Sequence, residues 1–194
     1  MPDRLVTGAD GLARCWWCGD DPLYVAYHDQ EWGRPTRGEQ EVFELLALEG
    51  FQAGLAWITI LRKREAFRAA FDGFDVATVA GYGEDDVERL LGDAGIVRHR
   101  GKIAATIDLA RLSLRLQSEG TSLSDLVWSH APPPRTVPLG PDDELPASTP
   151  ESTALSKELK ARGARFVGPT IVYAFMQSAG MVDDHLIGCH RAGS

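Results

Sequence analysis

Residues 86–103 of this chain read DVERLLGDAGIVRHRGKI, a pattern that predicts two helices joined by a tight turn. Gly95, which directly precedes Ile96, permits a sharp turn of the backbone. Amides in such a turn, and at the start of the second helix, would face outward, where they can bind a phosphate. The basic residues that follow the turn are Arg98, Arg100 and Lys102. The segment therefore has the form of a helix-hairpin-helix motif that binds DNA through its backbone, although an ordinary helical hairpin would look much the same.

Helical periodicity continues on both sides of this hairpin. Apolar residues recur at spacings of three and four over residues 39–50, 85–92 and 102–117, and later helices are predicted over residues 152–162 and 170–179. Ser152 or Thr153 is the expected N-cap of the helix over residues 152–162. No segment sustains the alternation of a half-buried strand, so we expect an all-α fold.

Two stretches carry no predicted helix or strand. Residues 131–150 contain seven prolines, which indicate a long surface loop. Residues 1–13 are expected to be a flexible N-terminal extension ahead of the fold. The remaining chain, residues 14–190, is expected to form a single unit that includes the hairpin at about residues 86–103.

Composition narrows the class of protein. The chain has 194 residues, of which 44% are hydrophobic and 25% charged, as in an ordinary globular domain. No apolar run is long enough to cross a membrane and no signal peptide is evident, so we expect a cytoplasmic protein without a membrane partner. The net charge of −8 weighs against general affinity for nucleic acids but allows a local basic surface. Nothing in the sequence demands more than a monomer.

Cysteine and histidine residues form two short pairs near the two ends of the chain, Cys15 with His28 and His185 with Cys189. Together they could supply the four ligands of a closed zinc site. On a helix, the spacing of four would place His185 and Cys189 on one face. A closed set leaves no coordination position for water or substrate, so the metal would stabilise the fold. Cys18 is a rival ligand to Cys15, and the alternative is that these side chains never meet.

A second group of residues is aromatic. Tyr24, Tyr27, Trp32 and Trp57 could gather around one acid, Glu49, which lies at the end of an otherwise apolar predicted helix. Aromatic residues at helical spacing are usually part of the core. The alternative is a pocket, because flat rings with a carboxylate at their edge suit a planar, electron-poor heterocycle. An unpaired acid in an apolar helix would otherwise be costly.

Several blocks of sequence are more specific than these motifs. They are DDPLYVAYHD at residues 20–29, EWG at 31–33, LEG at 48–50, QAGLAW at 52–57, DAGIVRHRGKI at 93–103, KARGARFVG at 160–168 and DHLIGC at 184–189. In this order they resemble the 3-methyladenine DNA glycosylase I family of constitutive bacterial repair enzymes. The resemblance extends from about residue 14 to residue 189. Trp16, Cys18, the proline-rich loop and His190 lie outside the matching blocks.

The resemblance implies a helix-hairpin-helix glycosylase fold with a small second lobe. Its zinc ligands fall on Cys15, His28, His185 and Cys189, and the lobe is built from residues 15–28 and 185–189. The expected zinc ion is single and structural. In this assignment Cys18 is not a ligand, although Cys18 or His190 could compete for the metal.

The resemblance also implies roles in base recognition. The enzyme would extrude a damaged nucleotide from duplex DNA into a pocket before it cuts the bond between base and sugar. Glu49 would be the catalytic residue, hydrogen-bonded to the edge of 3-methyladenine, while Tyr27 and Trp57 stack on its faces and Tyr24 lines the pocket. Gln52 and Leu55 would probe the base stack and fill the gap. The DNA-binding residues of the hairpin would be Gly95, Ile96, Arg98, Arg100 and Lys102.

The expected chemistry needs little acid or base assistance, because methylation at N3 leaves the base cationic and its glycosidic bond weak. No lysine is placed as a Schiff-base nucleophile, so we expect base removal without strand cleavage. The expected partner is double-stranded DNA that contains alkylated bases. Two other readings stay open: a zinc-fastened DNA-binding module without catalysis, and a helical enzyme that acts on a free purine or nucleoside.

Overall fold

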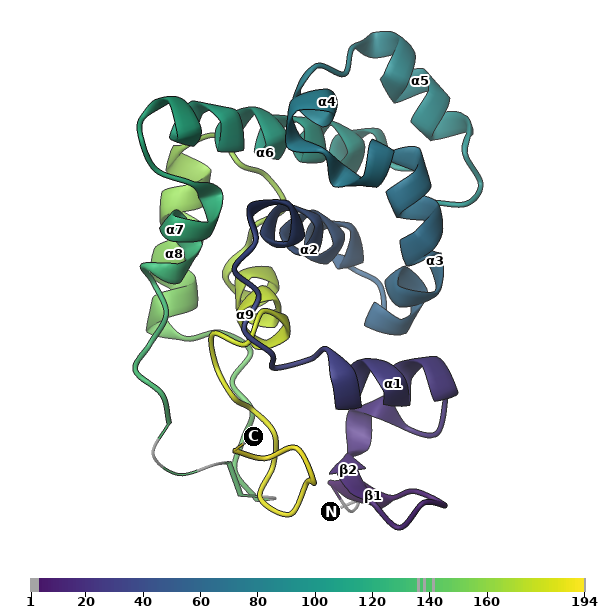
Figure 1. Cartoon of the computed structure of the whole chain (residues 1–194), viewed down its shortest axis with the longest axis vertical. Helices are drawn as coiled ribbons and strands as arrows, with labels where there is room; N and C mark the ends of the chain where they lie inside the picture. Colours follow the sequence, from purple (N-terminus) through teal and green to yellow (C-terminus); the bar gives the residue numbers. More distant parts are fainter. Residues whose placement is uncertain (1–3, 136, 138, 141, 194) are drawn as a thin grey trace.

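The computed structural model of the chain describes residues 4–135, 137, 139–140 and 142–193 (Figure 1). Its helices are α1 (Pro22–Gln30), α2 (Glu39–Gln52), α3 (Trp57–Ala70), α4 (Val76–Ala80), α5 (Glu84–Gly92), α6 (Arg100–Ser118), α7 (Leu123–Trp128), α8 (Pro150–Ala161) and α9 (Pro169–Ser178). Short 3-10 turns cover Trp16–Cys18 (η1) and Asp72–Phe74 (η2), and two strands, β1 (Leu5–Thr7) and β2 (Ala13–Cys15), pair with each other. Within the described part of the chain, no helix is both long and apolar enough to cross a membrane.

Helix α2 lies at the centre of a helical body formed by α2 to α9 (Figure 1). It contacts α3, α6, α7 and α9, and its residues Val42, Phe43 and Phe51 are fully buried. Every helix predicted from periodicity is present, with ends that differ by no more than two residues. The expectation of a helix-rich, essentially all-α fold is therefore confirmed. Helices α1, α3, α4 and α7 lie outside the predicted ranges.

The start of α8 differs from the prediction. Thr149 is the N-cap, because its Oγ1 accepts a hydrogen bond from the Ser152 amide at 3.2 Å. The Ser152 hydroxyl in turn accepts from the Thr149 amide at 2.9 Å, which completes a capping box. Neither Ser152 nor Thr153 is therefore the cap. Pro150 occupies the first helical turn, where its missing amide hydrogen costs nothing, so the proline-rich loop ends one residue earlier than expected.

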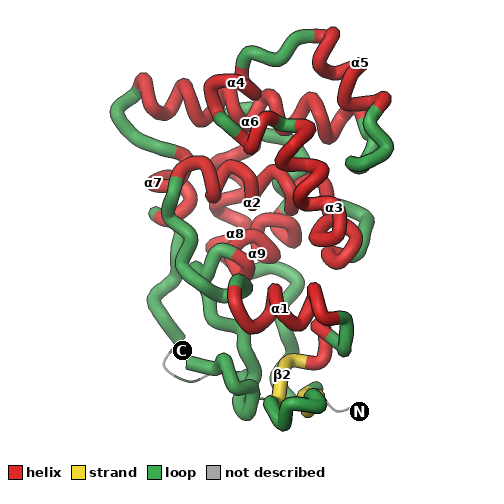
Figure 2. Tube along the Cα trace, turned by 45° about the vertical axis from the view of Figure 1, so that its right-hand side comes forward, coloured by secondary structure: helices red, strands yellow, loops and turns green. Residues whose placement is uncertain are grey.

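The two ends of the chain form a separate terminal lobe, which we define as residues 4–18, 139–140, 142–145 and 183–193. Strands β1 and β2 form an antiparallel pair with Leu5 opposite Cys15, and this sheet lies at the end of the molecule away from α5 (Figure 2). The C-terminal segment lies beside it, since the His190 amide donates to the Ala13 carbonyl at 2.9 Å. Leu186 also pairs with Leu139 in an isolated bridge.

Two expectations about these ends are corrected. Residues 5–7 and 13 are not a flexible extension, because strand pairing satisfies their backbone groups; residues 1–3 lie outside the described part. His185 and Cys189 do not lie on a helix. Gly188 between them has a φ of 94°, in the left-handed region that breaks a helix and favours glycine. The turn, in place of a helix face, brings these two residues toward the same centre.

Candidate active site and metal centre

A cavity of about 230 Å³ lies between the helical body and the terminal lobe. Its lining comprises Trp16, Trp17, Tyr24, Tyr27, Trp32, Glu49, Gln52, Trp57, Leu145, Ala174, Gln177 and Ser178. All five residues of the predicted aromatic group, with Glu49 as the acid, therefore line one pocket. Glu49 reaches it from the last turns of α2, and Trp57 from the first residue of α3.

Glu49 is the buried acid of this pocket, with 2% of its surface exposed. Its Oε1 accepts a hydrogen bond from the Ser178 hydroxyl at 2.8 Å, and that hydroxyl accepts from the Tyr27 hydroxyl at 3.0 Å. Its Oε2 is buried and has no hydrogen-bond partner among the residues that the structure describes. Burial raises the pKa of Glu49 to about 8. Glu49 thus presents an acceptor that is unpaired among the described residues, as does Gln52 with its buried Oε1, and a donor or a cation would stabilise it.

The aromatic rings enclose this acceptor without forming a parallel stack. The rings of Tyr27 and Trp57 have centroids 5.6 Å apart and planes inclined by 46°, and Tyr24 lies 6.3 Å from Tyr27. The Trp57 Nε1 is buried without a partner among the described side chains, so the pocket also offers a free donor. Burial raises the pKa of Tyr24 to about 12 and that of Tyr27 well above 10, so both hydroxyls are neutral at physiological pH.

Sequence reasoning missed six lining residues of the pocket, of which Ser178 and Trp17 contact the predicted group most directly. Ser178 positions the carboxylate of Glu49, but a single serine at the end of a helix gives no signal in the sequence. Trp17 packs against Tyr24 at 5.1 Å and against Trp32 at 4.9 Å. Its position beside Cys15 and Trp16 was visible, but nothing local shows which of two adjacent tryptophans faces inward.

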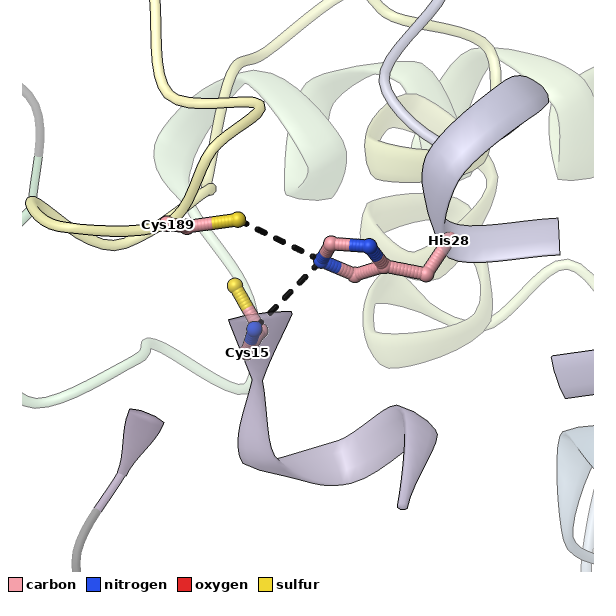
Figure 3. A group of neighbouring side chains, drawn as sticks. All are labelled: Cys15, His28 and Cys189. Carbon is pink, nitrogen blue, oxygen red and sulfur yellow. Dashed lines mark hydrogen bonds between the residues drawn. The ribbon is translucent and has the colours of Figure 1, made fainter. Parts of the chain in front are cut away.

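Three predicted metal ligands meet where α1 lies against the terminal lobe: Cys15 and Cys189 belong to the lobe, and His28 belongs to α1 (Figure 3). The ligand atoms of Cys15, His28 and Cys189 all lie within 4.8 Å of one another, and all three residues are buried. The Nε2 of His28 lies 3.5 Å from the Cys189 sulfur and 3.4 Å from the Cys15 amide. Neighbouring Cys15 and His28 lower the pKa of the Cys189 thiol. This is a possible metal-binding group.

His185, the fourth predicted ligand, lies beside this group but is not within the same 4.8 Å set. Its ring centroid is 5.1 Å from that of His28, and its buried Nε2 has no partner in the described part of the molecule. The Nδ1 of His185 lies 2.9 Å from Asp183 Oδ1, and the Nδ1 of His28 lies 2.8 Å from Asp29 Oδ1. Carboxylates that hold Nδ1 leave Nε2 as the ligand nitrogen, an arrangement common around metal-bound histidines. The residues present therefore fit a metal ion.

Cys18 and His190, the two rival ligands, do not belong to the group formed by Cys15, His28 and Cys189. Cys18 is buried, but its sulfur donates to the Cys15 carbonyl at 3.1 Å and does not belong to the group. His190 forms a second cluster with His28 and Asp29, in which its Nε2 lies 2.9 Å from Asp29 Oδ1. Asp29 is also held by two hydrogen bonds from the Arg14 Nε, at 2.9 and 3.0 Å. Asp29 is thus already engaged with neighbouring side chains.

The predicted hairpin consists of α5 and α6, joined by residues 93–99. The Gly95 amide does not face outward for a phosphate, because it donates to Asp93 Oδ1 at 2.7 Å. Ile96 is buried, with 3% of its surface exposed. The ammonium group of Lys63, on α3, donates to the carbonyls of Ala94 and Gly95 at 3.0 Å each. The turn is therefore braced from inside at these residues.

The basic residues after the turn also differ from one another. Lys102 is not at the surface: its ammonium group donates to the carbonyls of Phe51 and Ala53 at 2.7 and 2.6 Å, and burial lowers its pKa. It satisfies carbonyl groups that the end of α2 leaves unpaired. Arg100 pairs with Glu84 and Glu88 on α5, whereas Arg98 is exposed. Of the three, Arg98 is the exposed residue for which no ion pair is found among the described residues.

The turn from α2 to α3 places the two predicted probe residues at the edge of the pocket. Gln52 lines the cavity, and Leu55 is 40% exposed on the turn that precedes Trp57. Gly54 beside it has a φ of 80°, which favours glycine and sharpens the turn. An exposed leucine on a tight turn beside a buried pocket is not explained by core packing.

Comparison with known proteins identifies the family of the chain. The family model for methyladenine glycosylases matches residues 17–192. The chain belongs to the methyladenine glycosylase family. Membership makes it a DNA glycosylase, a hydrolase, as the sequence resemblance implied.

Relatives of this methyladenine glycosylase are similar over most of their length. DNA-3-methyladenine glycosylase 1 of Escherichia coli (strain K12) is 52% identical over 92% of this chain and 96% of that protein. A crystal structure of 3-methyladenine DNA glycosylase I superimposes with a TM-score of 0.89 at 51% identity, over 92% of this chain and 99% of that one. The structure that addresses 3-methyladenine recognition by the Staphylococcus aureus enzyme has a TM-score of 0.84 at 37% identity, over 90% and 93% of the two chains.

Proposed function

We propose that this methyladenine glycosylase hydrolyses the N-glycosidic bond of 3-methyladenine in alkylated double-stranded DNA and leaves the strand intact. The observation that carries the proposal is the unpaired Oε2 of Glu49, buried at the base of an aromatic pocket. The printed names of the relatives, which specify 3-methyladenine, support the choice of substrate.

The pocket suits a cationic purine better than a neutral one. Tyr27 and Trp57 offer π-faces that attract positive charge, and the carboxylate of Glu49 can accept a hydrogen bond from the edge of the base. In a site with little water, the attraction between carboxylate and cation is stronger than in solution. Normal adenine lacks the positive charge, so it would not offset the cost of ionising a buried acid.

The bond to be broken is already weak in this substrate. When the bond between N9 of the base and C1′ of the sugar breaks, its electron pair neutralises the cationic base, which leaves without protonation. Water supplies the new oxygen at C1′ and loses one proton to solvent. The protein therefore contributes mainly by binding the cation in the correct position, and a strong general acid is not required.

The depth of the pocket requires that the base leave the duplex. Glu49 is 2% exposed, so a base inside the double helix cannot reach it. Leu55 on the exposed turn would fill the gap in the stack, and Gln52 would contact the neighbouring bases. The α5–α6 hairpin would bind the DNA backbone, with Arg98 at its surface and Lys102 supporting the turn from within.

A single zinc ion would be held by Cys15, Cys189 and the Nε2 atoms of His28 and His185, a donor set of two sulfurs and two nitrogens that suits this metal. When bound, the ion would supply a structural cross-link. Cys15 ends β2, His28 lies on α1, and the other two ligands belong to the C-terminal segment. The metal would thereby hold the lobe that forms the outer wall of the pocket.

The test is chromatography of the bases released from methylated duplex DNA by wild type, Glu49→Gln and Glu44→Gln. Glu44 is a matched control because it lies on the same helix, is partly buried and pairs with Arg68, outside the pocket. Loss of the charged partner should reduce release of 3-methyladenine by Glu49→Gln on the order of 10²-fold. Glu44→Gln should stay within about twofold of wild type.

Other outcomes would redirect the assignment. Equal release by Glu49→Gln would remove Glu49 from its role while keeping the substrate. If folded, metal-loaded wild type bound DNA but released no base, the DNA-binding module without catalysis would be the better account. Nicked strands in the same samples, separated on a denaturing gel, would contradict base removal without strand cleavage.

A further inference from the structure

Parts of the chain that lie outside the matching sequence blocks meet at one edge of the pocket. Trp16 and Leu145 line the same cavity as Glu49, although Trp16 precedes the family-matched residues 17–192 and Leu145 lies in the proline-rich loop. The Arg4 guanidinium lies over the Trp16 ring at 4.5 Å and donates a hydrogen bond to the Asp143 carbonyl. We call Arg4, Trp16 and Leu145 the pocket rim.

Trp16 is the most exposed aromatic residue of the pocket. It is 36% exposed, compared with 9% for Trp57, 8% for Trp32 and 4% for Tyr27. Its neighbour Trp17 points into the interior, where it packs against Tyr24 and Trp32. The two adjacent tryptophans are thus divided between the wall of the pocket and its opening.

The pocket rim is held in place by the contacts of Arg4 and Leu145 as well as by Trp16. Arg4 joins strand β1 to the loop at Asp143, and Leu145 packs against the apolar cluster formed by Leu139 and Leu186. The stacked guanidinium and the loop limit the motion of the indole. A ring kept at the opening of a pocket can contact a ligand without losing much side-chain freedom on binding.

We propose that Trp16 is a further base-contacting residue of this pocket and that Arg4 is its positioning residue. The inference rests on the proposed function, because the ligand is the extruded N-alkylated purine cation. The indole has the strongest π-face for a cation, and contact with the base would bury the part of Trp16 that is now exposed. Glu49, Tyr27 and Trp57 would then hold the inner part of the base, and Trp16 its outer part.

The competing explanation is that Trp16 only covers the lobe. It predicts lower stability in a Trp16 variant with unchanged affinity for the base. The variants that separate the two are Trp16→Ala, Trp16→Phe and the control Leu23→Ala. Leu23 is 41% exposed on α1, close in sequence to the pocket residues, but it does not line the cavity.

The experiment is calorimetric titration of each zinc-loaded, full-length protein with free 3-methyladenine. For Trp16→Ala the dissociation constant should rise about 3- to 10-fold, the effect of one aromatic stacking contact with the free, neutral base. Trp16→Phe should recover most of this loss, and Leu23→Ala should bind within about twofold of wild type. Arg4→Ala should weaken binding in the wild-type background but add nothing in the Trp16→Ala background, which a purely structural role would not produce.

A second measurement needs no alanine variant to fold. In the wild-type protein, the nuclear magnetic resonance signal of the Trp16 indole N–H, assigned by its absence in Trp16→Phe, should shift as 3-methyladenine is added. Unchanged affinity of folded Trp16→Ala, or an unmoved indole signal at saturation, would overturn the inference while the proposed function stands. Wild type that neither binds 3-methyladenine nor releases it from methylated DNA would overturn both.

Discussion

The helical body and the terminal lobe are stabilised in different ways. The body has a continuous apolar core in which Phe43, Phe51, Phe67, Phe71 and Phe74 are fully buried around α2. The lobe has only a small apolar cluster, in which two of the buried members are the cysteines of the possible metal group. A cluster of that size cannot stabilise a unit by itself, which is why small folds commonly depend on a metal.

The pocket shows why this difference matters for function. Its acid and its inner aromatic wall, Glu49 and Trp57, belong to the body, whereas Trp16, Trp17 and Leu145 belong to or border the lobe. The proposed base recognition would therefore combine a part fixed by the apolar core with a part fixed by polar groups and the proposed metal site. A substitution that destabilises one region should leave the other region folded, so that its effect can be measured separately.

The largest effect is expected from Cys189→Ser. Loss of one proposed zinc ligand should cost the lobe on the order of 5 kcal/mol, because metal-binding energy is folding energy in such units. Amide hydrogen exchange should accelerate in β2 and the C-terminal segment but remain slow in α2. The measurement is exchange mass spectrometry together with the zinc content of the purified protein.

Cys18→Ser is the matched control for this change. Cys18 is buried near the group, but its sulfur bonds backbone carbonyls, so the variant should keep the metal and lose about 1 kcal/mol. Loss of zinc from Cys18→Ser and not from Cys189→Ser would show that the ligand set is wrong. Uniform exchange across body and lobe would show that the two regions unfold together.

Glu49→Gln is expected to raise the free energy of unfolding. This effect is smaller than the loss of stability in Cys189→Ser and has the opposite sign. The pKa of Glu49 is raised from 4.5 to about 8, so between these values the unfolded state releases a proton that the folded state keeps. The free energy of unfolding of wild type should therefore fall as pH rises through this window and level off above it. Glu49→Gln should remove this slope and stabilise the protein by about 2–3 kcal/mol at pH 7.

Denaturant unfolding of both proteins from pH 5 to pH 9 measures this difference. Tyr24 and Tyr27 stay protonated over most of this range, so they do not account for the slope. Equal slopes in wild type and variant would mean that Glu49 is ionised in the free protein. In that case burial in the pocket would not raise the pKa of Glu49 and would not destabilise the ionised acid.

The smallest effects are expected from substitutions of Lys102 and Arg98, which should differ in whether they change stability or the salt dependence of DNA binding. Lys102→Met removes two hydrogen bonds to the end of α2 and should cost about 2 kcal/mol of stability, with no change in the salt dependence of DNA binding. Arg98→Ala should leave stability within about 0.5 kcal/mol but reduce the salt slope by about one. The measurement is fluorescence anisotropy of labelled duplex DNA at several salt concentrations. A reduced slope for Lys102→Met would restore its predicted contact with phosphate.

Helices with a clear apolar stripe could be predicted from the sequence, whereas those with charged or mixed faces could not. The range 39–50 was predictable because Val42, Phe43 and Leu46 face one core. Helix α3 carries Arg62, Lys63 and Arg64, and part of its stability comes from pairs with distant residues, such as Arg64 with Glu31. The start of α1 was readable, since Asp21 and Pro22 are a usual cap and first residue.

The site was predictable where chemistry restricts the residue type. Glu49 and the tyrosines were singled out because an acid at the end of an otherwise apolar helix is unusual, and the cysteines and histidines because of their pairing, but the resemblance to the family assigned their roles. Ser178, by contrast, acts through a hydrogen bond across the fold, and Lys102 turns inward because α2 ends opposite it. Such roles depend on which distant backbone groups are left unpaired, and local sequence does not contain that information.

The pairing of the two chain ends has a consequence for the newly made protein. Residues 4–18, which include β1, β2 and Cys15, are made before the helical body, but the C-terminal residues that contact them, among them Leu186, Cys189 and His190, are made after it. The helical body can fold while synthesis continues, since most of its core is made by the end of α9 and Ala179, Met181 and Val182 follow directly. The lobe that forms the outer wall of the pocket cannot assemble until residues 183–193 have been made, so a copy truncated before them would have a folded body and a pocket wall that is not held in place.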